Sequence, residues 1–322
     1  MDDLESKLSP LGLARMTPAG FAGIAAHLAG LPPVCAELCD ASLRAWDPFT
    51  RLFGLDLGRR EAQIPALVSV YDGSASLWGP PLCAPDDPRL PVALATALDV
   101  LDEANVALLG TVEPSRALYV PAAWTVPIRH HRFTFATQGR EYLYARDGLA
   151  TLAGGARKRR RAEAHRFERE HAPVVEPCGA GAREECLALL ARWSGEKRIE
   201  SAEVARKMKL EVGAVARMLA MVAEPAPDRR LRGIVVRVRG AVVAFSLADD
   251  VGPGEVAILA EKTASGFAGL SSFVFREAAR RLAPEGSVVN AGEDWDLPGL
   301  AAAKRAFGPE AMRETLVVTR LR

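Results

Sequence analysis

Two short turns constrain this sequence more than any other feature. Asp72-Gly73 and Arg239-Gly240 each separate two runs of largely apolar residues. A residue pair that includes glycine between two such runs is typical of a β-hairpin, because glycine readily adopts the positive φ angles of a two-residue turn. The sequence therefore predicts one antiparallel hairpin in each half of the chain.

Helical patterns surround both predicted hairpins. The predicted helices are residues 17–30 and 91–104 in the first half, and residues 201–220 and 271–283 in the second. Thr17 and Ser201 fit the N-cap position, where a hydroxyl accepts a hydrogen bond from the first helical turn. Short apolar runs at 107–112, 133–137, 287–290 and 315–321 are strand candidates.

The order of these elements is similar in the two halves. Each has helices, a hairpin, a further helix and another strand, which predicts an α+β fold with two mixed, mainly antiparallel sheets flanked by helices. A chain of 322 residues is long enough for two domains. Gly154-Gly155 interrupts the pattern before a basic helix, so we expect domains at residues 1–150 and 151–322.

Composition narrows the class of protein. The net charge is +1, so any attraction for a polyanion must come from a local patch. The five cysteines match neither a zinc site nor a CxxC motif, and we expect reduced thiols. The acidic N-terminus lacks the apolar core of a signal peptide, and no apolar run is long enough to span a bilayer. A cytoplasmic protein is expected.

Four segments resemble a known bacterial family when they are taken in order. They are Y-L-Y-A-R-D-G-L-A-T-L-A-G-G-A-R-K-R-R-R-A-E-A-H-R-F at 142–167, G-I-V-V-R-V-R-G-A-V-V-A-F-S-L at 233–247, A-I-L-A-E-K at 257–262 and N-A-G-E-D-W-D-L-P-G-L-A-A-A-K at 290–304. The order and spacing resemble the uncharacterised family related to the C-terminal domain of phosphatidylglycerol lysyltransferases. The resemblance extends from about Thr17 to Leu316.

This resemblance implies a fold and an activity. The family fold is a tandem of two acetyltransferase-like (GNAT) domains, and its characterised relatives move an aminoacyl group from aminoacyl-tRNA to a lipid hydroxyl. We expect an acyltransferase that uses aminoacyl-tRNA as donor and an amine or hydroxyl of a small molecule or peptide as acceptor. The last family motif is changed here, because Ala291, Gly292 and Ala301 replace Arg, Glu and Arg, and Asp296 replaces Gly.

The segment 290–304 contains the expected catalytic residues. An aminoacyl ester is already activated, so an enzyme has to position it, accept a proton from the incoming nucleophile and stabilise an oxyanion. Glu293 or Asp294 can serve as the base or bind an ammonium group, and Lys304 can neutralise a phosphate or an oxyanion. Asn290 is expected to bind substrate. The alternative is that Asp294 or Asp296 only caps the following helix.

Three further residues are expected to contact substrate because of the resemblance. Glu261 and Lys262 end a strand, and since neighbouring strand residues face opposite sides, only one of the two can point into a given groove. Glu203 lies in the first turn of a helix, where an acidic side chain also stabilises the helix dipole. Solvated strand-end and helix-start positions are the alternative interpretations.

A basic helix is the candidate tRNA site. Arg157, Lys158, Arg159, Arg160 and Arg161 open it, and clusters of this kind bind phosphates. Phe167 is expected to anchor the helix to the core, and a solvated charged face is the alternative. His130, His131 and His165 lack the spacing of metal ligands, so we expect them to be structural and expect no metal.

Two alternative functions remain open from the sequence. Gly266 and Gly269 precede a helix whose N-terminal amides can hold a phosphate, which would suit an acyl-CoA-dependent N-acyltransferase. No Arg or Gln precedes these glycines, so the coenzyme A signal is weak. The third possibility is a family member that binds a ligand without catalysis, which the loss of the motif arginines favours.

Overall fold

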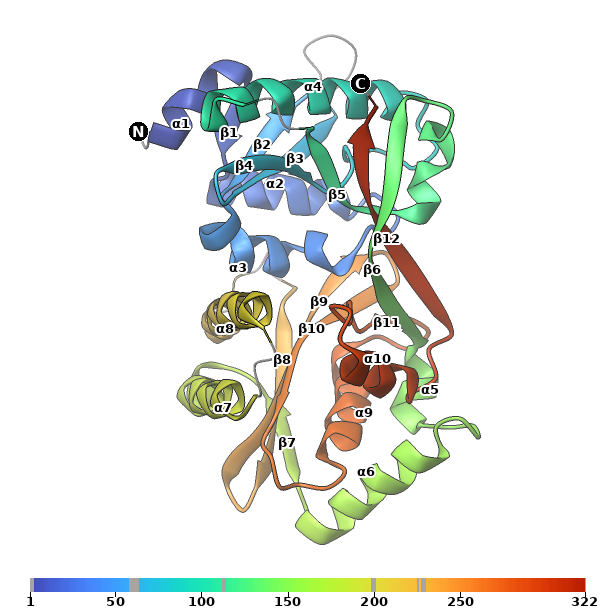
Figure 1. Cartoon of the computed structure of the whole chain (residues 1–322). Helices are drawn as coiled ribbons and strands as arrows, with labels where there is room; N and C mark the ends of the chain where they lie inside the picture. The colour runs from blue at the N-terminus through green and yellow to red at the C-terminus, as the bar shows by residue number, and fades with distance from the viewer. Residues whose placement is uncertain are drawn as a thin grey trace. The chain divides into compact units, whose positions relative to one another are not determined.

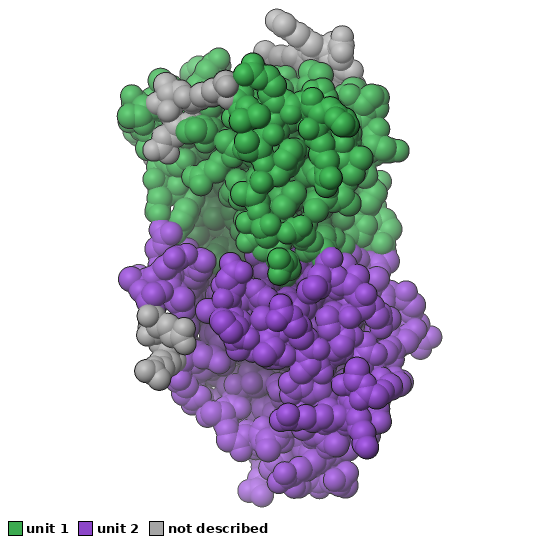
Figure 2. Space-filling model, turned by 45° about the vertical axis from the view of Figure 1, so that its right-hand side comes forward, with its two compact units in different colours: residues 1–140, 251–253, 313–322 green, residues 141–250, 254–312 purple. Residues whose placement is uncertain are grey.

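The chain divides into two units, which Figure 2 colours separately and Figure 1 shows as helices and strands. The computed structural model describes residues 3–57, 64–111, 114–197, 201–224, 226 and 230–321. Unit 1 comprises residues 1–140, 251–253 and 313–322, and unit 2 comprises residues 141–250 and 254–312. The chain enters unit 2 within strand β6 (Phe133–Ala145), before the expected boundary at 150/151, and strand β12 (Ala311–Arg320) returns it to unit 1.

Unit 1 consists of a sheet with helices on both faces. Its helices are α1 (Asp3–Leu8), α2 (Pro18–Leu28), α3 (Asp40–Thr50) and α4 (Leu90–Leu109), and its 3-10 helices are η1 (Ser9–Leu11), η2 (Ala36–Leu38) and η3 (Ala122–Ile128). Its complete strands are β1 (Leu13–Arg15), β2 (Leu52–Asp56), β3 (Pro65–Tyr71), β4 (Ser74–Trp78) and β5 (Arg116–Pro121). The strand order is β1-β2-β3-β4-β5-β12-β6. In Figure 1, α4 lies on one side of β2–β4, with α2 and α3 on the other.

Unit 2 has the same kind of architecture. Its helices are α5 (Arg146–Thr151), α6 (Lys158–His171), α7 (Arg183–Glu196), α8 (Ala202–Ala223), α9 (Leu270–Leu282) and α10 (Pro298–Arg305), with a 3-10 helix η4 (Ala180–Ala182). Its strands are β7 (Val174–Pro177), β8 (Arg232–Val238), β9 (Ala241–Gly252), β10 (Glu255–Thr263) and β11 (Val288–Asn290). The order is β6-β11-β10-β9-β8-β7. Figure 1 shows α7 and α8 on one side of β8–β10, and α9 and α10 on the other.

Both predicted hairpins are confirmed. Asp72 and Gly73 join β3 to β4 with φ angles of 49° and 78°, and Arg239 and Gly240 join β8 to β9 with φ angles of 51° and 82°. Positive φ at both central residues defines the turn type that matches the twist of two antiparallel strands. The two predicted caps are also present, since the Thr17 hydroxyl accepts from Gly20 N and the Ser201 hydroxyl from Val204 N.

One predicted strand is wrong. Residues 107–109 continue α4, and residue 112 lies outside the described part of the chain. A short apolar run is compatible with either a strand or a buried helix end, and here the helical periodicity of the preceding residues continues through it. The next strand of unit 1, β5, begins later, at Arg116.

A parallel strand pair is present within each mainly antiparallel sheet. In unit 1, β4 and β5 pair in parallel and α4 connects them. In unit 2, β10 and β11 pair in parallel and α9 connects them. Parallel neighbours need a crossover of this kind, because a tight turn can only reverse the chain direction. Each unit therefore contains the same strand–helix–strand crossover, which fits the two acetyltransferase-like domains expected from the resemblance.

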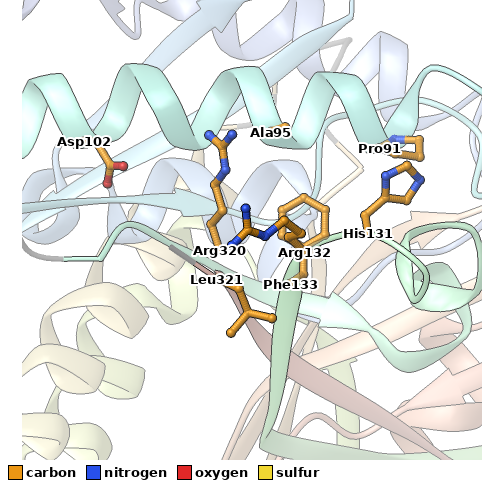
Figure 3. A pocket seen from close by; sticks show the side chains of 8 residues that line it. All are labelled: Pro91, Ala95, Asp102, His131, Arg132, Phe133, Arg320 and Leu321. Atoms are coloured by element: carbon orange, nitrogen blue, oxygen red, sulfur yellow. The ribbon is translucent and has the colours of Figure 1, made fainter.

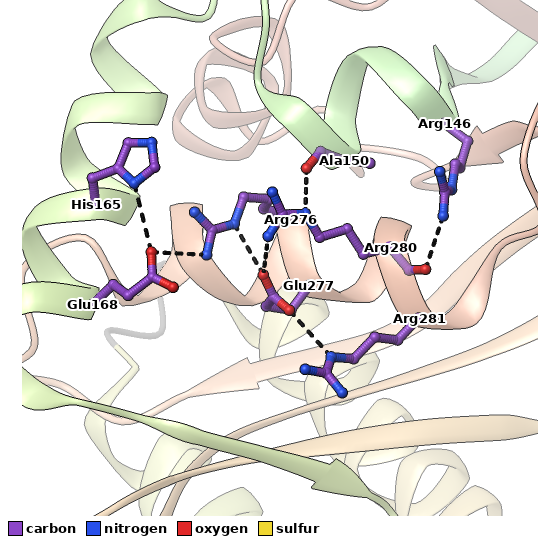
Figure 4. Close-up of polar contacts among 8 residues, drawn as sticks. All are labelled: Arg146, Ala150, His165, Glu168, Arg276, Glu277, Arg280 and Arg281. Carbon is purple, nitrogen blue, oxygen red and sulfur yellow. Dashed lines mark hydrogen bonds and ion pairs between the residues drawn. The ribbon is translucent and has the colours of Figure 1, made fainter.

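Helix α9 carries two buried charged residues that pair with each other and with their neighbours (Figure 4). Arg276 and Glu277 are both buried, and their Nε–Oε1 distance is 3.0 Å. Glu277 also accepts from Arg280 and Arg281, while Arg276 reaches Glu168 of α6. On the neighbouring aromatic surface, the fully buried Phe167 of α6 packs against Phe273, which confirms its predicted role as an anchor.

Candidate functional site

The candidate site of unit 2 lies where β10 extends past its parallel partner. The register of β10 and β11 ends at the pair Ala257–Asn290, but β10 continues to Thr263. No residue of β11 stands opposite the segment 258–263. The chain leaves β11 into the loop 291–297, which precedes α10. Glu261 and Lys262 lie on this extension of β10, and Glu293, Asp294 and Lys304 lie on the loop and on α10.

Glu261 carries a shielded carboxyl group with a raised pKa. Its Oε2 is shielded from solvent and has no hydrogen-bond partner among the described residues. Burial raises the pKa of Glu261 to about 8, although the positive charges of Lys262 and Lys304 act in the opposite direction. A carboxyl with a pKa near neutrality can accept and release a proton at physiological pH.

Lys262 is directed away from this group. Its ammonium lies 2.6 Å from Glu211 of α8 and 3.9 Å from the ring centroid of Trp193 of α7. Its side chain is buried between those elements. Adjacent strand residues face opposite sides, so Glu261 faces away from α7 and α8. The sequence left open which of the two residues points into a given groove; these contacts place Lys262 on the side of α7 and α8 and Glu261 on the opposite side.

The Lys304 ammonium holds the loop that follows β11. It donates to the backbone carbonyls of Ala291, Gly292 and Glu293 at 2.6, 2.9 and 2.5 Å. An ammonium group has three N–H donors, so it cannot donate to a phosphate or an oxyanion without releasing one of these carbonyls. This geometry favours a positioning role for Lys304, in which it keeps three carbonyl oxygens together near the end of β11.

Asp294 uses both of its carboxylate oxygens within the chain. Oδ2 accepts from the Tyr142 hydroxyl at 2.5 Å, and Oδ1 accepts from the backbone N–H of Asp296 at 3.0 Å. The second contact closes a turn in which Trp295 and Asp296 both have positive φ angles. Asp294 therefore organises the loop before α10, but neither it nor Asp296 caps that helix, because the N-cap residue is Leu297 and no side chain caps it. Glu293 contributes its carbonyl to Lys304.

Asn290 lies in a buried network of its own. Its side-chain amide donates to Glu141 and to Glu255, both at 2.9 Å, and its Oδ1 accepts from Gly292 N at 2.8 Å. All three side chains are buried. One amide thus links two buried carboxyl groups on β6 and β10 and fixes the end of β11. The structure gives Asn290 contacts that orient the loop.

The basic helix α6 divides into two sets of residues. Arg157 donates to the carbonyls of Phe307 and Gly308, Arg161 donates to that of Leu152, and Arg160 pairs with Glu163. The exposed cationic residues are Lys158, Arg159, Arg166 and Arg169. Their spacing places them along one helical face. Sequence reasoning did not single out Arg166 and Arg169, although the 3–4-residue periodicity from Arg159 indicates both.

The start of α9 is covered by α6. Gly269 has a φ angle of 86°, and a Cβ added there would lie 2.3 Å from the carbonyl oxygen of Glu163. The Ser272 hydroxyl donates to the Glu163 carboxylate at 2.8 Å. Burial alone would raise the pKa of Glu163, but hydrogen bonds from Ser272, Arg159 and Arg160 keep it lowered. A carboxylate therefore lies at this helix N-terminus, where a ligand phosphate would otherwise be favoured.

The remaining candidate residue, Glu203, lies outside the contacts around β10 and the loop 291–297. Glu203 is exposed on α8 and pairs with Lys207 at 3.0 Å, and this hydrogen bond lowers the pKa of Glu203.

In the described part of the chain, no three His, Cys, Asp or Glu side chains are grouped as metal ligands. None of its described helices is long and apolar enough to cross a bilayer.

Comparisons with solved structures support the tandem acetyltransferase-like class. A conserved protein of unknown function from Bacteroides thetaiotaomicron superposes with a TM-score of 0.79 at 19% identity, over 96% of this chain and 99% of that one. L-PGS from Bacillus licheniformis gives 0.67 at 13% identity, over 95% and 93%. FemX gives 0.61 at 10% identity, over 96% and 97%. No curated protein matches the sequence significantly.

These likenesses show that the two units together have a tandem acetyltransferase-like fold. The sequence model of the phosphatidylglycerol lysyltransferase C-terminal domain matches residues 60–318. The chain belongs to that family, as the order of its sequence segments predicted.

Proposed function

We propose that this protein transfers an aminoacyl group from aminoacyl-tRNA to an amine or hydroxyl acceptor, with Glu261 as general base. The observation that carries the proposal is the shielded Oε2 of Glu261, with its raised pKa, on the part of β10 that β11 does not cover. The unprotonated fraction of Glu261 at pH 7 can accept a proton. The backbone carbonyls of residues 291–293, which Lys304 holds, directly follow the neighbouring strand β11.

The chemical step needs no covalent enzyme intermediate. The acceptor nitrogen or oxygen attacks the ester carbonyl carbon, and its proton passes to Glu261. The bond from that carbon to the ribose oxygen then breaks, and the ribose oxygen takes a proton from the Glu261 carboxyl. Family membership supports a transferase, and the carboxylate of Glu163 at the start of α9 favours an aminoacyl ester over a coenzyme A thioester as donor.

The exposed cations of α6 support the proposal that the aminoacyl donor is bound through its tRNA. Lys158, Arg159, Arg166 and Arg169 are exposed along one side of the helix, where Arg159 and Arg166 also pair with Glu163 and Glu170. Exposed cations of this kind bind a phosphate backbone in a salt-dependent manner. Arg160 and Arg161 have contacts within the fold, so their removal would disturb structure as well as charge. Replacing Arg166 and Arg169 with Gln should weaken filter binding of bulk tRNA at low salt.

The direct test is transfer from radiolabelled bulk aminoacyl-tRNA to acceptors in a cell extract. Glu261→Gln should lower the rate by about 100-fold or more, the usual contribution of a general base, while tRNA binding stays unchanged. Glu285→Gln is the matched control, because Glu285 is 88% exposed. Transfer from acyl-CoA instead of tRNA would support an N-acyltransferase, and tRNA or thioester binding without turnover would support a non-catalytic protein. Either result would refute the proposal.

A further inference from the structure

A cavity of about 500 Å³ lies in unit 1, and none of the candidate residues lines it (Figure 3). It lies beside α4, where β6 begins and β12 ends. Its lining residues are Pro91, Ala95, Asp102, His131, Arg132, Phe133, Arg320 and Leu321. A volume of this size falls within the range of small-molecule sites, which is about 300–1,000 Å³.

The lining combines cationic and apolar side chains. Arg132 and Arg320 supply the cationic groups, His131 adds an imidazole ring, and a single carboxylate, Asp102, lies along α4. Pro91, Ala95, Phe133 and Leu321 supply apolar surface. Phe133 is buried, whereas Leu321 keeps 48% of its surface exposed. A ligand that satisfies both parts of the lining needs an apolar body and an anionic group.

Backbone hydrogen bonds hold the cationic wall in place. Leu321 N donates to Arg132 O at 2.8 Å, Phe133 N to His131 O at 2.8 Å, and His131 N to Ile128 O at 3.0 Å. In Figure 3 the Arg320 side chain points toward α4, where it pairs with Asp99. The wall is therefore part of the folded unit, and a ligand would not have to order it, which lowers the cost of binding.

We propose that this cavity binds an amphipathic organic anion, with its charged group at Arg132 and Arg320 and its apolar part against Phe133 and Leu321. A guanidinium pair recognises a carboxylate or a phosphate through charge-assisted hydrogen bonds. Asp102 accepts a hydrogen bond from the backbone of Ser115, so its negative charge stays on the α4 side of the cavity. This arrangement selects a molecule with one charged end over a dianion with a charge at each end.

Calorimetric titration with decyl phosphate below its micelle concentration tests this site on the full chain. Decanol supplies the apolar part without charge, and inorganic phosphate supplies the charge without the apolar part. Decyl phosphate should bind at least tenfold more tightly than either. Arg132→Gln should weaken its binding about tenfold, the effect of losing one charge-assisted contact. The matched control is Arg129→Gln, an equal charge change at an exposed residue that does not line the cavity.

A second variant distinguishes the cavity from diffuse surface binding. Ala95→Trp fills the cavity from α4 and should abolish decyl phosphate binding while circular dichroism stays unchanged. Equal weakening by Arg129→Gln and Arg132→Gln, equal affinity for decanol, or full binding by Ala95→Trp would overturn the proposal. Sedimentation with phosphatidylglycerol vesicles then tells whether the same anionic group is taken from a bilayer, in which case Ala95→Trp should reduce that binding too.

Discussion

The two units share a strand–helix–strand crossover but differ in what they bury. The buried polar side chains of unit 1 in the described residues are hydroxyls and one amide: Ser42, Thr50, Ser69, Ser76, Asn105, Ser115, Thr125 and Thr315. Unit 2 buries charged groups as well: Glu141, Asp249, Glu255, Lys262, Arg276, Glu277 and Asp294. Burying charge is costly unless it is paired, so a unit that does so repeatedly is a better candidate for chemistry than one that does not.

The two crossovers also differ in how much of the strand before the helix pairs with the strand after it. In unit 1, β4 ends at Trp78, which still pairs with β5. In unit 2, β10 continues for six residues beyond its last pair with β11, and Glu261 lies on that extension. The same architecture thus gives a closed strand pair in one unit and an open one in the other. The comparison teaches that the position of the Glu261 carboxyl follows from strand length and register, and the crossover alone does not provide it.

The largest effect is expected for Glu277→Leu in unit 2. This change removes the acceptor of three arginines and leaves Arg276 buried with only Glu168, so the unfolding free energy should fall by about 4 kcal/mol. Urea denaturation measures it. The unit 1 control is Asp3→Asn, which breaks an exposed pair with Lys7 and should change stability little. Similar losses in both variants would contradict the distinction between the units.

Two buried asparagines give a direct comparison of the units. Asn290→Leu leaves Glu141 and Glu255 without their shared donor and should cost about 3 kcal/mol, because bonds to carboxylates are the stronger ones. Asn105→Leu in unit 1 removes contacts to neutral groups, Ala75 and Ser115, and should cost about 1–2 kcal/mol. Thermal unfolding of both variants checks the order. A larger loss for Asn105→Leu would reverse the comparison.

Lys304→Met separates a positioning role from a catalytic one. The change releases three carbonyls and should lower stability by about 2 kcal/mol. Transfer activity should fall as well, because the loop after β11 is no longer held. Arg305→Met on the same helix is the control, since Arg305 is exposed. Full stability together with lost activity would show that Lys304 acts on substrate directly.

Glu261→Gln should change the pH dependence of stability. The folded pKa of about 8 lies above the ordinary glutamate value of 4.5, so the folded state holds an extra proton between these values. This stabilisation is present at low pH and is lost as the pH rises through about 8, with a slope of at most about 1.4 kcal/mol per pH unit. The Gln variant should lack that slope in urea titrations from pH 5 to 9. Parallel curves for both proteins would disprove the raised pKa.

Local features were predictable because they depend on neighbouring residues alone. The two hairpin turns require positive φ at adjacent positions, and Thr17 and Ser201 cap the turns that directly follow them. The strand predicted at 107–112 was wrong because a short apolar segment does not by itself specify strand or helix. For the site, the segment 290–304 and the pair Glu261-Lys262 could be selected, but the role of each side chain could not.

By itself, the sequence determined the tandem fold, the family and the segments that surround the candidate site. Only the tertiary structure decided that Lys304 is held by the carbonyls of 291–293, that Asp294 pairs with Tyr142, and that Glu261 and not Lys262 faces the α10 side. The physical reason is distance along the chain. Tyr142 and Asp294 are 152 residues apart, and Lys262 and Glu211 are 51 apart. Such contacts depend on how strands and helices pack, and no local pattern encodes that packing.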